Sequence, residues 1–79
     1  SIRVSPESSQ ANEGDTVTIR CEARVSVTWS KDQGRLPLNA QETNGVLTLY
    51  RVSATDSGIY VCASVQDERI FRQAQVRIP

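Results

Sequence analysis

Apolar and polar side chains alternate along most of this 79-residue chain. In residues 16–23, TVTIRCEA, every second position is apolar or cysteine, and the positions between them are polar. Alternation with a period of two is typical of a β-strand with one buried face. Similar patterns predict strands over residues 25–31, 46–52 and 71–78, and a run with two largely apolar faces predicts another over residues 58–65.

Short polar segments that contain glycine, proline, asparagine or aspartate separate these runs. Many short strands punctuated in this way predict an all-β sandwich, and no long stretch has a helical period. Residues 53–56, SATD, predict one short helical turn, because Ser53 and Asp56 have the spacing of a capping box. Gly58 follows this turn, where we expect either a crowded site or a positive φ.

The composition excludes several classes of function. Nine Lys and Arg residues balance nine Asp and Glu residues, so the chain has neither the charge expected of a nucleic-acid binder nor a pull toward an anionic membrane. No apolar run approaches the ~20 residues that span a bilayer. The chain starts inside a strand-like IRV and stops just after a strand-like AQVRI, which favours a single domain, residues 1–79, cut from a longer secreted protein.

The residues needed for common catalytic and metal sites are scarce. The chain has no histidine, and its two cysteines are Cys21 and Cys62. An even pair in a small domain favours a disulfide and an oxidising compartment, with two buried free thiols as the alternative. We therefore expect no enzymatic activity and no cofactor or metal. The adjacent acids Asp67 and Glu68 are interpreted as part of a solvated loop.

Several distinctive residues fall at fixed offsets within the predicted strands. Trp29 follows Cys21 by eight residues, and Tyr60 precedes Cys62 by two, within the stretch DSGIYVC. This order resembles the signature of the immunoglobulin superfamily. The residues that carry the resemblance are Cys21, Trp29, Asp56, Gly58, Tyr60 and Cys62.

The resemblance implies an immunoglobulin-like β-sandwich with two antiparallel sheets joined by one disulfide. It implies that Cys21 and Cys62 form this bond, that Trp29 packs against it, and that Tyr60 makes a tyrosine corner with its hydroxyl bonded to upstream backbone. Asp56 and Gly58 would build the turn that directs Tyr60 into the core.

Finer features resemble the I-set class, and within it the tandem immunoglobulin modules of the perlecan family of basement-membrane heparan sulfate proteoglycans. The string WSKDQGRLP, residues 29–37, carries most of that likeness. Many relatives place an arginine or lysine before the strand that starts near Val46, to pair with the acid at the position of Asp56. Residues 38–46 contain none, so we expect Asp56 to bind backbone, or to pair with Arg35 or Arg51.

Three surfaces are candidates for binding a partner. The outer side of the strand over residues 58–65 carries apolar side chains, flanked by polar residues of two neighbouring strands and by Arg77 at the rim. Such a patch marks a contact site, or else reflects only the preference of β-branched residues for strands. Phe71 near a hairpin tip is a second candidate, and Arg20 beside Tyr50 on the opposite sheet is a third. The residues predicted to bind a partner are Ile59, Val61, Val65, Phe71 and Arg77.

The resemblance predicts a monomeric, secreted module of the extracellular matrix or basement membrane. It would bind an extracellular protein and support adhesion and matrix assembly. The alternatives are a passive spacer in a tandem array, an immunoglobulin domain of a cell-surface receptor, and an intracellular module with free thiols. A further alternative is weak binding of heparan sulfate through Arg69, Arg72 and Arg77.

Overall fold

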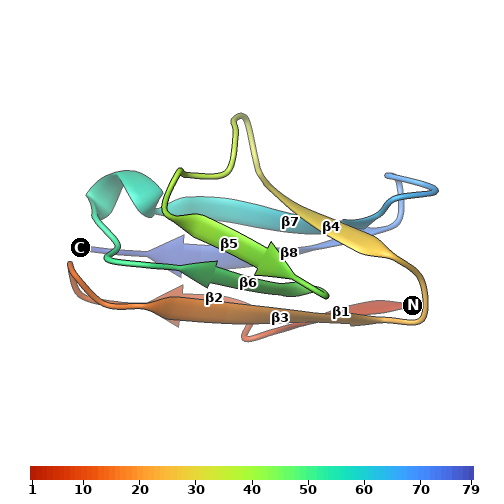
Figure 1. Cartoon of the computed structure of the whole chain (residues 1–79), viewed down its shortest axis with the longest axis horizontal. Coiled ribbons are helices and arrows are strands. Elements are labelled where there is room, and N and C mark those ends of the chain that lie inside the picture. Colours follow the sequence, from red (N-terminus) through yellow and green to blue (C-terminus); the bar gives the residue numbers. More distant parts are fainter.

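The computed structural model describes all 79 residues, which form eight strands and one short 3₁₀ turn, η1. The strands lie along the long axis of the molecule, and the two termini lie at its opposite ends (Figure 1). The elements in chain order are β1 Ile2–Ser5, β2 Ser8–Gln10, β3 Val17–Ala23, β4 Val27–Lys31, β5 Ala40–Thr43, β6 Val46–Leu49, η1 Ala54–Asp56, β7 Gly58–Ser64 and β8 Phe71–Arg77.

Two four-stranded sheets make the sandwich. Their strand orders are β1-β3-β6-β5 and β2-β8-β7-β4. Every pairing is antiparallel except that of β2 with β8, which is parallel. The predicted all-β sandwich is confirmed, and one edge pairing departs from the expected antiparallel pattern.

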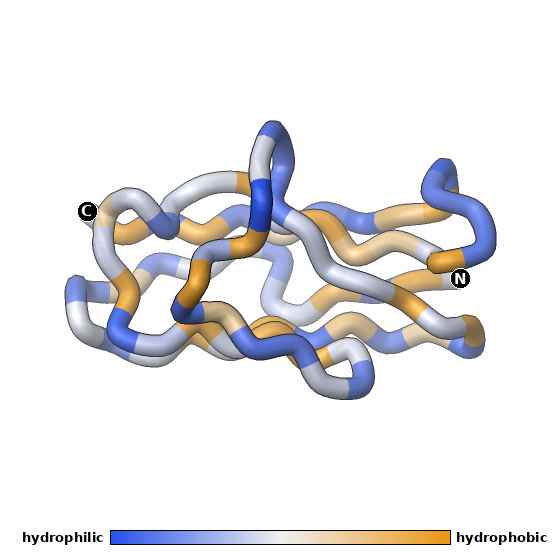
Figure 2. Tube along the Cα trace, turned by 45° about the horizontal axis from the view of Figure 1, so that its top comes forward, coloured by the Kyte–Doolittle hydropathy of each residue, from blue (hydrophilic) through white to orange (hydrophobic).

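Fourteen buried residues form one core between the sheets. Each central strand contributes every second side chain to it, which is why hydrophobic and hydrophilic positions alternate along the tube in Figure 2. The core consists of Ile2, Val4, Val17, Ile19, Cys21, Trp29, Leu47, Leu49, Val52, Tyr60, Cys62, Ala74, Val76 and Ile78.

A disulfide between Cys21 of β3 and Cys62 of β7 joins the two sheets, as the resemblance implies. Trp29 lies opposite Cys62 on the neighbouring β4 and is almost fully buried. Its indole Nε1 donates a hydrogen bond to the carbonyl oxygen of Gly45 at 2.8 Å. Gly45 has φ +83°, and a Cβ there would lie 2.6 Å from the carbonyl oxygen of Cys21, so a side chain would push this turn off the core.

Asp56 organises the turn before β7. Its carboxylate accepts hydrogen bonds from the Ser53 backbone N–H at 3.0 Å and from Asn39 Nδ2 at 3.1 Å. Its backbone carbonyl oxygen accepts the Tyr60 hydroxyl at 2.6 Å, which is the bond of a tyrosine corner. The expectation that Asp56 binds backbone is therefore met. The segment that lacks a cation supplies the amide of Asn39 instead, and neither Arg35 nor Arg51 pairs with this acid.

Lys31 covers the same corner from β4. Its Nζ donates to the carbonyl oxygen of Thr55 at 2.9 Å and lies 5.6 Å from the centre of the Tyr60 ring. Gly58 has φ +149°, and a Cβ there would meet Lys31 Cε at 2.9 Å. Both reasons expected for a glycine at this position are therefore present, because the backbone has a positive φ and a side chain would clash with Lys31.

Two expectations fail at the strand ends and edges, and two strands were not predicted. The alternation over residues 25–31 predicts Val25 on the same face as Val27, but β4 begins at Val27 and Val25 is 47% exposed. Arg20 faces Val46 across the β3–β6 pair, so Tyr50 lies four positions further along and does not flank it. The strands β2 and β5 were not predicted, because SSQ and AQET carry almost no apolar alternation.

The Tyr60→Phe variant is expected to lose roughly 1–3 kcal/mol of unfolding free energy, because the buried carbonyl of Asp56 loses its donor. Chemical denaturation of both proteins measures the difference. The Tyr50→Phe variant is the matched control, since the Tyr50 hydroxyl makes only an exposed bond to Gln41 at 3.3 Å. A neutral Tyr60→Phe result would contradict the structural importance of the corner.

Tyr60 also predicts a loss of stability in alkaline solution. Burial, and then the charge of Asp56, raise its pKa to about 12. An unfolded tyrosine titrates near about pH 10. Because the folded state holds this proton more tightly, the contribution is complete below about pH 10 and is lost as the pH rises through about 12. The difference in unfolding free energy between wild type and Tyr60→Phe should therefore decrease between about pH 10 and about pH 12, as measured by denaturant titrations at each pH.

Candidate functional site

The strand register brings the expected neighbours together on the outer face of the β2-β8-β7-β4 sheet. Val61 of β7 lies between Ser30 of β4 and Gln73 of β8. Ala63 likewise lies between Thr28 and Phe71. The central strand therefore presents apolar side chains, while its neighbours are mostly polar.

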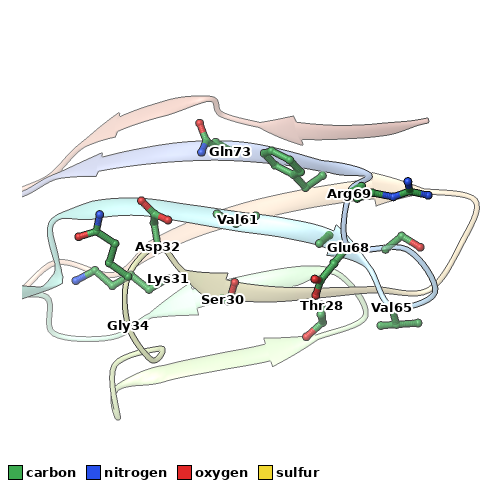
Figure 3. Close-up of a pocket in the computed structure, with 14 residues that line it drawn as sticks. Thr28, Ser30, Lys31, Asp32, Gly34, Val61, Val65, Glu68, Arg69 and Gln73 are labelled. Carbon is green, nitrogen blue, oxygen red and sulfur yellow. The ribbon is translucent and has the colours of Figure 1, made fainter.

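An open hollow lies in this face, and four apolar side chains contribute to it. Val61 lies near its middle and Val65 at one end (Figure 3). Val65 is 57% exposed and Phe71 is 40% exposed, whereas Val61 and Ala63 are half-buried. The apolar surface is thus concentrated toward the end of the sheet that carries the β7–β8 loop.

Two of the predicted partner-binding residues lie outside this hollow. Ile59 is half-buried near the start of β7, and Arg77 lies at the end of β8, opposite Gln10 of β2. Neither residue lines the hollow. The structure thus groups Val61, Val65 and Phe71, and it places Ile59 and Arg77 toward the other end of the same sheet.

Four charged residues also line the hollow. They are Lys31, Asp32, Glu68 and Arg69. Arg69 donates from Nε and Nη2 to the carboxylate of Asp67, at 3.0 Å in each case. These hydrogen bonds hold the pKa of the Asp67 carboxyl below its usual value and raise the pKa of Arg69.

The three arginines considered as a heparan sulfate site, Arg69, Arg72 and Arg77, do not lie on one surface. Arg69 is already paired with Asp67. Arg72 lies opposite Cys62 and therefore points to the inner side of β8, whereas Arg77 points to the outer side five positions further along. A sulfated chain would need several free cations on one side, and these three residues do not provide them.

The edge of the sheet at β4 is protected by a carboxylate from the other sheet. Glu42 of β5 accepts the backbone N–H of Trp29 through Oε2 at 2.9 Å. Such an edge amide would otherwise be open to another chain. Sequence patterns gave no sign of this bond, because the two residues belong to strands of different sheets.

The structure contains no group of three or more His, Cys, Asp or Glu residues that could hold a metal ion. None of its helical segments has the length and hydropathy needed to cross a membrane.

The family model described as an immunoglobulin domain matches residues 1–64, which is most of the chain. The chain belongs to the immunoglobulin domain family. Members of this family and fold are typically non-catalytic, and immunoglobulin domains generally mediate interactions between proteins.

Relatives of this immunoglobulin domain are extracellular or cell-surface proteins. The basement membrane-specific heparan sulfate proteoglycan core protein of Mus musculus is 43% identical over an alignment of 65 residues, which covers 77% of this chain and 2% of that protein. The MAM domain-containing glycosylphosphatidylinositol anchor protein 1 of Gallus gallus is 36% identical over an alignment of 61 residues, which covers 71% of this chain and 6% of that protein. The resemblance to basement-membrane proteoglycan modules is thereby confirmed.

A solved structure shows the same immunoglobulin fold. The full ectodomain of mouse nectin-like molecule 4 superposes with a TM-score of 0.70 and 25% identity, covering 99% of this chain and 29% of that one. The chain therefore spans only a small part of each of these proteins.

The Glu42→Ala variant is expected to lose about 1–3 kcal/mol of unfolding free energy, because the Trp29 N–H loses its acceptor. Hydrogen exchange at the Trp29 amide should accelerate in the same variant. Glu42→Gln keeps an acceptor oxygen of the same reach and should lose less. Equal losses in the two variants would contradict a role for this hydrogen bond.

Proposed function

We propose that this immunoglobulin domain is a non-enzymatic, extracellular module that binds protein through the outer face of the β2-β8-β7-β4 sheet. The observation that carries the proposal is the apolar surface of an open hollow, formed by half-buried Val61 and by exposed Val65 and Phe71. A small folded domain gains little by leaving such side chains in water, whereas a partner can bury them.

The setting proposed for the module is a secreted proteoglycan of the basement membrane or extracellular matrix, where binding would support adhesion and matrix assembly. The 43% identity to a basement-membrane proteoglycan supports this setting. Because the chain covers only 2% of that relative, we infer that it is one of many modules in a longer protein.

The expected affinity of the isolated module is modest. Burial of apolar surface contributes about 25 cal/mol per Å², and much of the gain from a few side chains is offset by the cost of association. A neighbouring module that binds the same partner would raise the overall affinity through its high local concentration. As an isolated unit the module is expected to be monomeric.

A passive spacer is the second candidate, and the positions of the termini favour it. They lie at opposite ends of a molecule that is 34 Å long, so modules joined through them would extend end to end (Figure 1). A spacer needs a stable fold but no binding face.

The Val61→Glu variant tests the binding face. The side chain lies on the outer side of β7, so the variant should fold with little change in unfolding free energy, yet lose most of its binding to an immobilised basement-membrane extract. The carboxylate introduced by Val61→Glu would lose its contact with water on binding and would gain no hydrogen bond or opposite charge in return. Circular dichroism and solid-phase binding measure the two effects.

Thr18→Glu provides the matched control, because Thr18 is an exposed β-branched residue on the outer face of the other sheet. It should leave binding unchanged. Equal binding by wild type and both variants would support the spacer. Unfolding of Val61→Glu would show that the outward assignment of Val61 is wrong.

A further inference from the structure

We propose that the hollow binds an extended segment of a partner protein that carries two cationic side chains four residues apart, with an apolar side chain midway between them. This inference rests on the proposed function and specifies the chemistry of the partner. It combines Val61 near the middle of the hollow with the carboxylates of Asp32 and Glu68 toward its ends.

The two cations that line the hollow are already engaged. Alternation along β4 places Lys31 on the inner side with Trp29, and its Nζ binds the Thr55 carbonyl oxygen at 2.9 Å. Arg69 makes two hydrogen bonds to Asp67. Arg69 is thus neutralised by a carboxylate, whereas Lys31 keeps its charge but holds it at the Thr55 carbonyl oxygen and near the Tyr60 ring.

The two acids that line the hollow have no such partners. Asp32 and Glu68 take part in none of the side-chain hydrogen bonds or ion pairs of the structure, which contains one salt bridge, between Arg69 and Asp67. In Figure 3 they lie toward opposite ends of the hollow, with Val61 between them. Each end of the hollow therefore has one carboxylate without a hydrogen-bond or ion-pair partner.

The strand geometry sets the spacing between these acids. Glu68 and Thr28 both line the hollow, and in the view of Figure 3 Glu68 is drawn toward the Thr28 end of β4, away from Asp32. Thr28 and Asp32 are four residues apart, which corresponds to about 13 Å at about 3.3 Å per residue. Ser30, midway between them, lies opposite Val61.

An extended ligand has the same repeat as β4. Side chains at its positions i, i+2 and i+4 share one face and span about 13 Å. A segment aligned with β4 can therefore place cations at Glu68 and Asp32 while its central apolar side chain covers Val61. A sulfated glycan would bring negative charge to both acids, so it does not fit this surface.

The test is a titration of the ¹⁵N-labelled module with capped pentapeptides, followed by NMR. The first peptide is lysine-threonine-valine-threonine-lysine with acetyl and amide ends, the second has glutamate in place of both lysines, and the third has serine in place of valine. The lysine peptide should shift the amides of Ser30 and Val61 with a Kd in the millimolar range. The serine peptide should bind several-fold more weakly, and the glutamate peptide should give no shift.

Asp32→Asn and Glu68→Gln should each weaken the lysine peptide several-fold, and added salt should weaken it in the wild type. Glu13→Gln is the matched control, because it removes one exposed acid outside the hollow and changes the net charge equally. It should bind the peptide as the wild type does.

Three results would overturn the inference. They are equal binding of the lysine and glutamate peptides, equal weakening by Glu13→Gln, and no shift in the hollow up to about 10 mM peptide. If Val61→Glu still abolished binding to the basement-membrane extract in those cases, the proposed function would stand and only the partner chemistry would be rejected. If Val61→Glu had no effect on the extract, the proposed function itself would fail.

Discussion

The covalent bond between Cys21 and Cys62 sets the orientation of the strands that the rest of the molecule uses. Because side chains alternate along a strand, an inward Cys62 requires that its neighbours Val61 and Ala63 point outward. The same bond that closes a small core therefore also decides which side chains reach the solvent. A shift of β7 by one residue would bury the proposed binding face and expose Cys62 at the same time.

Much of the fold could be predicted from the sequence because its signals are local. Period-two alternation located four of the strands that supply most of the core, a largely apolar run located β7, and the residues around Tyr60 indicated the corner. The polar edge strands β2 and β5 have no such pattern, since they form through pairing with β8 and β6. Asn39 was missed for a related reason, because its bond to Asp56 joins residues 17 positions apart.

The candidate surface was only partly predictable. Alternation placed Val61 outward, and the register of β4 and β8 supplied the neighbours that the sequence suggested. The pattern could not show that Lys31 turns back onto the Tyr60 corner, since that contact joins β4 to η1. Arg72 and Arg77 are close in sequence, but they do not share one surface, because strand alternation places them on opposite sides of β8.

A formal net charge of zero does not make every surface electrically neutral. In this chain the cations near the hollow are held by a backbone carbonyl and by Asp67, while two acids remain without partners. For the binding proposed here, the apolar surface is too small to discriminate between partners by area alone, so much of the selectivity would come from the charges. Covering Asp32 or Glu68 with a neutral or anionic surface would remove water from a carboxylate without replacing its interactions. If the proposed binding is correct, the same acids would favour cationic partners and disfavour neutral or anionic ones, so a small exposed face could still be selective.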